Sequence, residues 1–228
     1  MGAIGITLLW AGSGQNLERK KSLGTKIYLV RHGETDWNRE RRIQGGSSDT
    51  PLNASGTRQA KNLALFLAGE DIRAVYSSPL SRSMDTAGAI AGAHCLGVMA
   101  ERDLREIEAG TLEGITLDEL GTNFSEMLTK ENAGGGLPTV PGGESLPDVQ
   151  RRGWKIARRI AADNHDSIVV MVSHYFVILA IVCAALDLPL TRLSRLSVRP
   201  GSISAISLDG ENARLELLNQ AAGQPKNP

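Results

Sequence analysis

The sequence predicts an α/β fold, in which a mostly parallel sheet with an antiparallel edge is covered by helices on both faces as a three-layer α/β/α sandwich. Two observations carry this prediction. Three short apolar runs each precede a segment whose apolar residues recur at helical spacing, which is the pattern of strand–helix units. Two further strand-like runs near the C-terminus are separated by a turn, which adds an antiparallel pair.

The first strand–helix unit begins with a buried strand over 27–30. A turn-like segment at 53–56 separates this strand from a helix. The apolar residues of that helix lie at helical spacing: Ala60, Leu63, Ala64 and Leu67. In the second unit a strand over 72–76 is followed by Ser77-Ser78-Pro79, which opens a helix toward Ala93 with Pro79 tolerated in its first turn.

The third unit combines a strand over 168–172 with a helix over 175–186, and the runs 203–208 and 214–218 form a terminal hairpin around Asp209-Gly210. Before this unit, Ser145 begins a helix with Asp148 in the capping-box position. The segment 132–143 holds five glycines and two prolines, so it is a long loop that cannot form a core element.

Length and charge describe an ordinary folded chain of 228 residues. The basic and acidic residues balance at 25 each, and 41% of the residues are hydrophobic. We expect one domain over 25–228 and a disordered extension over 1–24. The neutral charge without a long basic run argues against a nucleic-acid partner. Cys95 and Cys183 show no CxxC spacing, so we expect no disulfide framework and no zinc site, and a cytoplasmic location.

The run 167–186 lacks Asp, Glu, Lys and Arg and is long enough to cross a bilayer of roughly 30 Å. Its first part is β-branched, however, and the polar pair Ser173-His174 interrupts it. We therefore predict a buried strand that leads into a buried helix, and no membrane association.

The ends of the three predicted parallel strands carry the chemistry. Arg31-His32 follows the first strand, Ser77-Ser78 leads from the second to Arg82, and Ser173-His174 ends the third. Ligands of open α/β sheets bind beyond these carboxyl ends. The chain has four histidines, and His94 and His165 lack this placement, so we interpret them as surface or packing residues.

Two arginines that face two imidazoles form a site for an anion with several oxygens, for which phosphate is the natural candidate. A neutral imidazole nitrogen can attack a phosphoryl group, and nearby guanidinium charges lower the imidazole pKa. This chemistry requires no metal and no cofactor. The surroundings of the predicted site are poor in carboxylates, and the chain has no P-loop motif, in agreement with this prediction.

The motifs resemble those of the histidine phosphatase superfamily, also called the phosphoglycerate mutase-like family. The resemblance covers residues 27 to about 186 through these blocks, in order: Leu29-Val30-Arg31-His32-Gly33-Glu34-Thr35-Asp36-Trp37-Asn38, Arg42-Ile43-Gln44-Gly45, Thr50-Pro51-Leu52-Asn53-Ala54-Ser55-Gly56, Tyr76-Ser77-Ser78-Pro79-Leu80-Ser81-Arg82, Leu104-Arg105-Glu106-Ile107, Pro141-Gly142-Gly143-Glu144-Ser145 and Val172-Ser173-His174.

The resemblance implies that His32 is the nucleophile that accepts the phosphoryl group. It implies that Arg31, Arg82 and His174 bind the phosphoryl oxygens, and that Glu106 donates a proton to the leaving oxygen. Four neighbouring carboxylates are rivals for this last role: Glu101, Asp103, Glu108 and Glu113.

Asn38, Gln44 and Gly45 match motif positions close to the phosphate or the leaving group. For Asn38 and Gln44 the alternative is hydrogen bonding within a loop. We interpret six further arginines as solvated: Arg41, Arg42, Arg151, Arg152, Arg158 and Arg159. Arg41 and Arg42 could instead guide an anionic substrate toward the site.

Within this family the alternatives are a phosphatase and a cofactor-dependent mutase. Mutases that resemble the family carry a long insertion between the acid block and the second histidine, which is absent between Glu106 and His174, so we predict a phosphatase. Many members follow this histidine with glycine, whereas this chain has Tyr175-Phe176-Val177. An aromatic wall there would suit a phosphate ester of a ring-bearing alcohol, such as α-ribazole phosphate; phosphoserine stays open, as does a homodimer.

Overall fold

The computed structural model describes residues 24–131 and 136–223, and all six of its strands form one sheet in the order β3-β2-β4-β1-β5-β6. The strands are β1 (Thr25–Arg31), β2 (Ile72–Ser77), β3 (Val98–Ala100), β4 (Ile168–Ser173), β5 (Ser202–Asp209) and β6 (Asn212–Ala221). The first four run parallel to one another, whereas β5 is antiparallel to β1 and to β6. The predicted mostly parallel sheet with an antiparallel edge is thereby confirmed.

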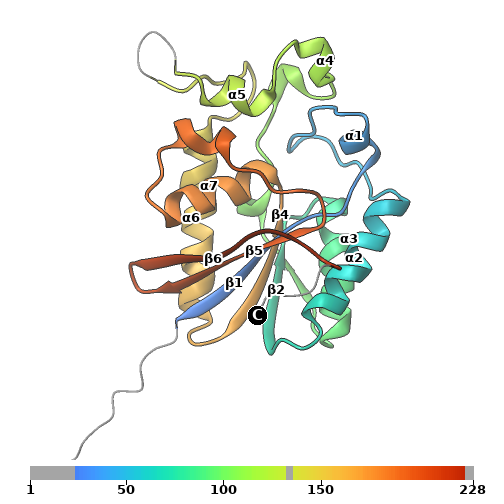
Figure 1. Cartoon of the computed structure of the whole chain (residues 1–228), viewed down its shortest axis with the longest axis vertical. Coiled ribbons are helices and arrows are strands. Elements are labelled where there is room, and N and C mark those ends of the chain that lie inside the picture. The colour runs from blue at the N-terminus through green and yellow to red at the C-terminus, as the bar shows by residue number, and fades with distance from the viewer. Residues whose placement is uncertain (1–23, 132–135, 224–228) are drawn as a thin grey trace, which may run out of the picture.

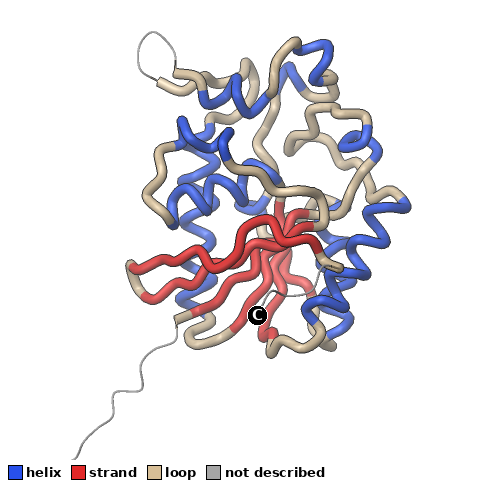
Figure 2. The backbone as a smooth tube through the Cα atoms, in the orientation of Figure 1, coloured by secondary structure: helices blue, strands red, loops and turns tan. Residues whose placement is uncertain are grey.

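Helices cover both faces of the sheet, as predicted (Figures 1 and 2). One face carries α2 (Ala54–Leu67) and α3 (Ser81–Ala93), and the other carries α6 (Leu146–Asp163) and α7 (Tyr175–Ala185). Alternate residues of β1 belong to the two cores: Ile27 and Leu29 pack with α6 and α7, whereas Tyr28 and Val30 pack with α2 and α3. This alternation explains why the strand reads as a continuous apolar run.

Two predicted boundaries were wrong. The predicted turn at 53–56 is the first turn of α2, because the Asn53 side chain caps this helix by accepting a hydrogen bond from the Gly56 N–H at 2.9 Å. The helix α3 begins at Ser81 and not at Pro79, because Leu80 has extended backbone angles and its N–H bonds to Ser78 Oγ at 3.4 Å.

The sequence did not predict the shortest elements. These are β3, α1 (Asp36–Arg39), α4 (Leu117–Leu120), α5 (Phe124–Thr129) and the 3₁₀ turns η1 (Arg102–Leu104), η2 (Gly110–Leu112) and η3 (Leu190–Arg195). None is longer than six residues, which is too short to show a helical or strand period. Figure 1 shows α1, α4 and α5 at one end of the molecule, beyond the carboxyl ends of the parallel strands.

The run 167–186 forms β4 and the buried helix α7, as predicted. No helix within the described ranges combines the length and the hydrophobicity that a membrane span requires. Residues 136–143, the described part of the predicted loop, form no helix or strand, whereas 132–135 lie outside the described residues. Of the predicted extension 1–24, only Gly24 is described.

Candidate active site

The sheet register brings the three strand ends together. Arg31, the last residue of β1, pairs with Ser173 of β4, and Ser77 at the end of β2 pairs with Val172. The backbone beyond the strands is bonded in the same way, since the His32 N–H donates to the Ser173 carbonyl at 3.1 Å. The rings of His32 and His174 consequently lie 5.0 Å apart between their centroids.

His32 is 3% exposed, and its Nδ1 lies 2.7 Å from the Gly33 carbonyl oxygen. A carbonyl can only accept, so Nδ1 carries the proton and Nε2 of the neutral ring carries the lone pair. Burial, followed by the positive charges of Arg82 and Arg31, holds the pKa of His32 well below its usual value. The environment therefore keeps Nε2 available as a nucleophile at neutral pH.

His174 is fully buried, and its Nε2 lies 2.8 Å from Ser78 Oγ. A second hydroxyl, Ser83 Oγ, lies 3.3 Å from the same nitrogen, and each hydroxyl can donate to Nε2 or accept from it. The other ring nitrogen, Nδ1, is buried and has no hydrogen-bond partner among the described residues. Burial first and then the Arg82 charge hold the pKa of His174 well below its usual value.

Arg82 lies in the first turn of α3 and is fully buried. Its two terminal nitrogens donate to the carbonyls of Ser48 at 2.7 Å and Gly45 at 3.1 Å. Burial lowers the pKa of Arg82 to about 10, so the guanidinium stays charged at neutral pH. Arg31 donates to the Val198 carbonyl at 2.8 Å, and its guanidinium carbon lies 5.2 Å from the centre of the Tyr175 ring.

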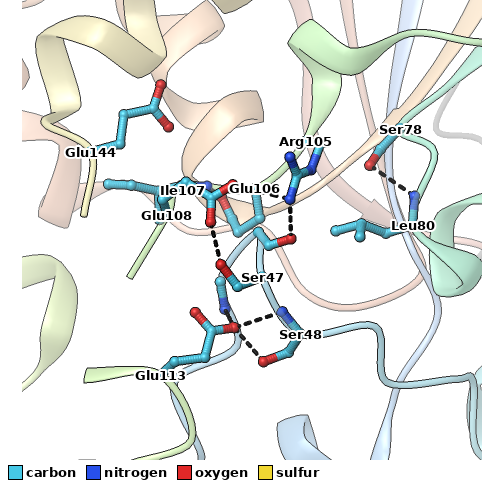
Figure 3. Close-up of polar contacts among 12 residues, drawn as sticks. Ser47, Ser48, Ser78, Leu80, Arg105, Glu106, Ile107, Glu108, Glu113 and Glu144 are labelled. Carbon is cyan, nitrogen blue, oxygen red and sulfur yellow. Dashed lines mark hydrogen bonds and ion pairs between the residues drawn. The ribbon is translucent and has the colours of Figure 1, made fainter. Parts of the chain in front are cut away.

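Two of the rival carboxylates hold the loop 45–48 that contacts Arg82 (Figure 3). Glu113 accepts the N–H groups of Gly45 at 2.9 Å and Ser48 at 3.0 Å, and Glu108 accepts from Ser47 Oγ at 2.6 Å. Glu108 also pairs with Arg105 at 3.0 Å. Glu113 Oε1 and Glu108 Oε2 are thus bound to the loop, whereas Glu113 Oε2 is buried and has no partner among the described residues.

Glu106 lies in a different environment from its rivals. It is 5% exposed, Oε1 accepts the Ile107 N–H at 2.8 Å, and Oε2 accepts the Phe176 N–H at 3.3 Å. Burial raises the pKa of the Glu106 carboxyl above its usual value, although these N–H groups and the charge of Arg31 act in the opposite direction. Glu101, by contrast, pairs with Arg159 at the surface.

A cavity of about 270 Å³ lies at the carboxyl end of the sheet and is lined by Arg31, Asn38, Arg41, Arg42, Ile43, Gln44, Glu106, Leu117, Asn123, Phe124, Ser125, Tyr175 and Phe176. Of the predicted binding residues, Asn38, Gln44 and Tyr175 line it, whereas Gly45 lies against Glu113 and Arg82. The sequence did not indicate the residues of α4 and α5, because these helices are too short to show a periodic pattern.

Asn38 and Gln44 also take part in a local network. Asn38 Oδ1 accepts the Thr35 N–H at 3.1 Å as part of the capping box of α1, and Gln44 Oε1 accepts from Thr35 Oγ1 at 2.9 Å. The side-chain oxygens of Asn38 and Gln44 thus make hydrogen bonds within the loop, as the alternative interpretation expected. Both residues also line the cavity, and the Gln44 amide nitrogen is buried and has no partner among the described residues.

Buried nitrogen atoms without hydrogen-bond partners gather on the residues predicted to bind the substrate. Eight buried side-chain nitrogen or oxygen atoms of the described chain lack a partner, and four of them are Arg31 Nε, Arg82 Nε, Gln44 Nε2 and the ring atom His174 Nδ1. A buried donor without an acceptor is rare in folded proteins, because it loses its hydrogen bonds to water. The three N–H donors among these atoms, on Arg31, Arg82 and Gln44, fit an anion with several oxygens. No group of three or more His, Cys, Asp or Glu side chains within the described ranges has the arrangement of a metal site.

Two interpretations of the sequence need correction. Arg152 is not solvated: its side chain is 18% exposed, pairs with Glu144 at 2.7 Å and donates to three backbone carbonyls. Val177, part of the predicted aromatic-wall segment, is fully buried in the core and does not line the cavity. Arg41 and Arg42 do line it, but Arg41 pairs with Asp118 at 3.2 Å and Arg42 with Glu40 at 2.7 Å.

An α/β sandwich with histidines and arginines at its strand ends places this chain in the class of phosphoryl-transfer enzymes. The model of the histidine phosphatase superfamily (branch 1) matches residues 27–221, and the chain belongs to this superfamily.

A probable phosphoglycerate mutase GpmB of Proteus mirabilis is 36% identical over 183 residues, which are 79% of this chain and 84% of the relative. A phosphoserine phosphatase of Entamoeba histolytica, solved with 3-phosphoglyceric acid, is 28% identical with a TM-score of 0.74 over 86% of this chain and 97% of that chain. A putative α-ribazole-5′-P phosphatase of Escherichia coli is 26% identical with a TM-score of 0.74 over 89% of this chain and 100% of that chain.

Proposed function

We propose that the chain is a metal-independent phosphomonoesterase, which hydrolyses a small-molecule phosphate ester through a phosphohistidine intermediate on His32. The observation that carries the proposal is the set of three buried N–H donors without partners, on Arg31, Gln44 and Arg82, in the site that holds an unprotonated His32 Nε2. Donors fixed before the substrate arrives stabilise the charge of a phosphoryl group without reorganising in the transition state.

In the first step His32 Nε2 attacks phosphorus, so an N–P bond forms while the bond between phosphorus and the ester oxygen breaks. The protonated Glu106 carboxyl donates its proton to the departing oxygen, which leaves as the alcohol. The raised pKa of Glu106 supports this role, since a carboxyl with an ordinary pKa would already have lost its proton near neutral pH.

In the second step water attacks the phosphohistidine. Glu106, now a carboxylate, takes a proton from this water as the new P–O bond forms and the N–P bond breaks. Inorganic phosphate and neutral His32 are released. Arg82, whose pKa is about 10, stays charged throughout, and Arg31 and Arg82 hold the phosphoryl oxygens in both steps.

We further propose that the alcohol part of the substrate is apolar or ring-bearing, as in α-ribazole 5′-phosphate. Phe124, Tyr175 and Phe176 give the cavity an aromatic wall, in which Phe176 meets the other two rings edge to face at 5.3 and 5.1 Å. The rim arginines carry compensated charges, since Arg41 and Arg42 each pair with a carboxylate. This wall favours a ring over a second anionic group.

A phosphoglycerate mutase is the second candidate, and the 36% identity to a probable phosphoglycerate mutase favours it. The segment between Glu106 and His174 contains η2, α4, α5, α6 and β4 and lacks the long insertion expected of such mutases. Phosphoserine is the third candidate, supported by the similar phosphoserine phosphatase.

We place the enzyme in the cytoplasm, where Cys95 and Cys183 stay as the free thiols that the structure contains.

The test measures phosphate release from chelator-treated protein with four esters: α-ribazole 5′-phosphate, phosphoserine, 3-phosphoglycerate and a generic aryl phosphate. We expect release to persist in the chelator and α-ribazole 5′-phosphate to have the highest kcat/KM. A protein that releases nothing, yet converts 3-phosphoglycerate to 2-phosphoglycerate when primed with bisphosphoglycerate, is a mutase, and the proposal is then wrong. Release that requires added metal would also contradict it.

A further inference from the structure

Glu106 is carried by backbone that belongs to no helix or strand. The segment 105–109 connects η1 with η2, so no sheet ladder fixes its position. A general acid must nevertheless lie within hydrogen-bond reach of the leaving oxygen. Apart from the Phe176 N–H, which binds Oε2, the position of the Glu106 carboxyl therefore depends on what holds the backbone of this segment.

Arg152 of α6 holds two carbonyls of this segment and one carbonyl of η1. Its Nη1 donates to Asp103 O at 2.7 Å and to Arg105 O at 2.6 Å, and its Nη2 donates to Glu106 O at 3.3 Å. The remaining donors bind Glu144, with Nε 2.7 Å from Oε1 and Nη2 2.8 Å from Oε2. A guanidinium has five N–H donors in a fixed plane, and here every one of them has an acceptor.

Glu144 is itself fixed to the same segment. Its N–H donates to the Glu108 carbonyl at 2.9 Å. A Cβ atom at the preceding Gly143 would lie 2.5 Å from this carbonyl oxygen, so only glycine permits the close approach of the two chains. From the loop 45–48, the Gly46 N–H donates to the Ile107 carbonyl at 2.9 Å and Ser47 Oγ donates to the Glu108 carboxylate (Figure 3). The segment is thus held both by this loop and by the pair of Arg152 and Glu144.

We propose that Arg152 and Glu144 form a positioning pair, which holds the backbone of Glu106 so that its carboxyl reaches the leaving oxygen of the substrate. The inference rests on the proposed function, because it assumes that Glu106 is the general acid. Neither residue lines the cavity, so the pair acts through Glu106 and not on the substrate. The sequence interpretation missed it, since Arg152 lies on a helix face rich in exposed arginines.

We expect the protein to fold without the pair, because water can take the place of the Arg152 guanidinium. A second hollow of about 540 Å³, lined by Arg152, Glu144, Asp103 and their neighbours, lies on the far side of the segment. Water that enters from this hollow can bind the carbonyls that Arg152 releases. The expected defect is therefore a displaced carboxyl in a folded protein.

The test compares Arg152→Met with Arg151→Met, a neighbour on α6 that is largely exposed and pairs with Asp148. The readout is kcat/KM, which reports the steps up to transfer to His32, for an alkyl phosphate and for 4-nitrophenyl phosphate. A displacement of about 1 Å costs up to about a hundredfold in rate, so we expect Arg152→Met to lower kcat/KM for the alkyl ester tenfold to a hundredfold. The change for the 4-nitrophenyl ester, whose leaving group needs no proton, should stay below about threefold, and Arg151→Met should match the wild type.

A double variant separates positioning from general stability. Glu106→Gln combined with Arg152→Met should lose little more activity on the alkyl ester than Glu106→Gln alone, because the pair acts mainly through this carboxyl. Of the influences that lower the pKa of His174, burial is the largest and the Arg152 charge is the smallest. Additive losses, equal losses on both esters, or no loss would each overturn the proposal. If Arg152→Met does not fold by circular dichroism, Glu144→Gln, which keeps the volume and removes the charge of the pair, enters the same comparison. A wild type without phosphatase activity, or one indifferent to Glu106→Gln, refutes the proposed function instead.

Discussion

His32 and His174 lie at strand ends, whereas Glu106 lies on a segment outside every helix and strand. The histidine side of the site, defined by Arg31, His32, Arg82 and His174, inherits its geometry from the parallel register of β1, β2 and β4. The acid side, defined by Glu106 with Glu144 and Arg152, depends on side-chain hydrogen bonds to backbone carbonyls.

This difference predicts how the two sides respond to change. Backbone ladders spread the position of a histidine over many hydrogen bonds, so only the replacement of the side chain itself removes its function. The backbone of Glu106, whose carbonyl Arg152 binds, can be displaced by a substitution 46 residues away in the sequence. Substitutions on the histidine side should therefore affect all phosphate esters alike, whereas those on the acid side should depend on the leaving group.

The largest effect is expected from His32→Ala, which removes the nucleophile. Without Nε2 no phosphohistidine forms, and kcat/KM should fall by more than about a thousandfold for alkyl and aryl esters alike. The matched control is His165→Ala, since His165 is exposed and lies outside the site. Phosphate release with acid-quench detection of labelled phosphoenzyme measures both consequences, and a labelled intermediate in the His32 variant would show that another residue is the nucleophile.

Glu106→Gln should lower kcat/KM for an alkyl ester by about a hundredfold to ten-thousandfold and change its pH dependence. In the wild type the protonated carboxyl is the active form, so kcat/KM falls as pH rises through the pKa of Glu106. Because burial raises this pKa, the fall begins at higher pH than for an ordinary glutamate. The depressed pKa of His32 places the acidic limb below that of an ordinary histidine.

The glutamine variant should lack the Glu106 limb, since an amide does not titrate. Ionisation of the substrate phosphate is common to both proteins, so the difference between the two pH profiles isolates the carboxyl. If both profiles fall together at high pH, the limb belongs to another group and the role of Glu106 as the acid is refuted.

Arg82→Lys tests whether a substitution on the histidine side affects alkyl and aryl phosphate esters equally. A lysine keeps the charge but cannot make two carbonyl bonds and still present a fixed third donor, as Arg82 does with its Nε. We expect a loss of about a hundredfold in kcat/KM. The loss should be equal for alkyl and 4-nitrophenyl phosphate, with Arg73→Lys at the surface as the control. A loss confined to the alkyl ester would show that Arg82 supports proton donation by Glu106 and does not mainly stabilise the phosphoryl group.

The sequence predicted the histidine side well for a physical reason. An apolar strand followed by a polar tripeptide is visible in one dimension, and parallel strands bring their carboxyl ends to one edge. The register that places Arg31 beside Ser173 follows from this arrangement. The predicted roles of the side chains stay predictions, because the geometry places the groups without showing turnover.

The surroundings of Glu106 could not be predicted in the same way. Arg152 is one of several arginines on α6, and no periodicity distinguishes the one that turns inward from its exposed neighbours Arg151 and Arg159. Its acceptors are backbone carbonyls, which leave no mark in the sequence. Phe124 likewise reaches the cavity from a helix of six residues, too short to show a period.

The smallest effect is expected at the aromatic wall, where Tyr175→Ala tests the substrate class and not the chemistry. Tyr175 borders the cavity, and its hydroxyl donates to the Leu196 carbonyl at 3.3 Å. Removing an apolar wall changes discrimination between substrates by about tenfold to two-hundredfold. We expect kcat/KM for α-ribazole 5′-phosphate to fall about tenfold relative to phosphoserine, with Leu65→Ala as the exposed control. An unchanged ratio would mean that the ring of the substrate lies elsewhere, and that Tyr175 serves to order Arg31 on the histidine side.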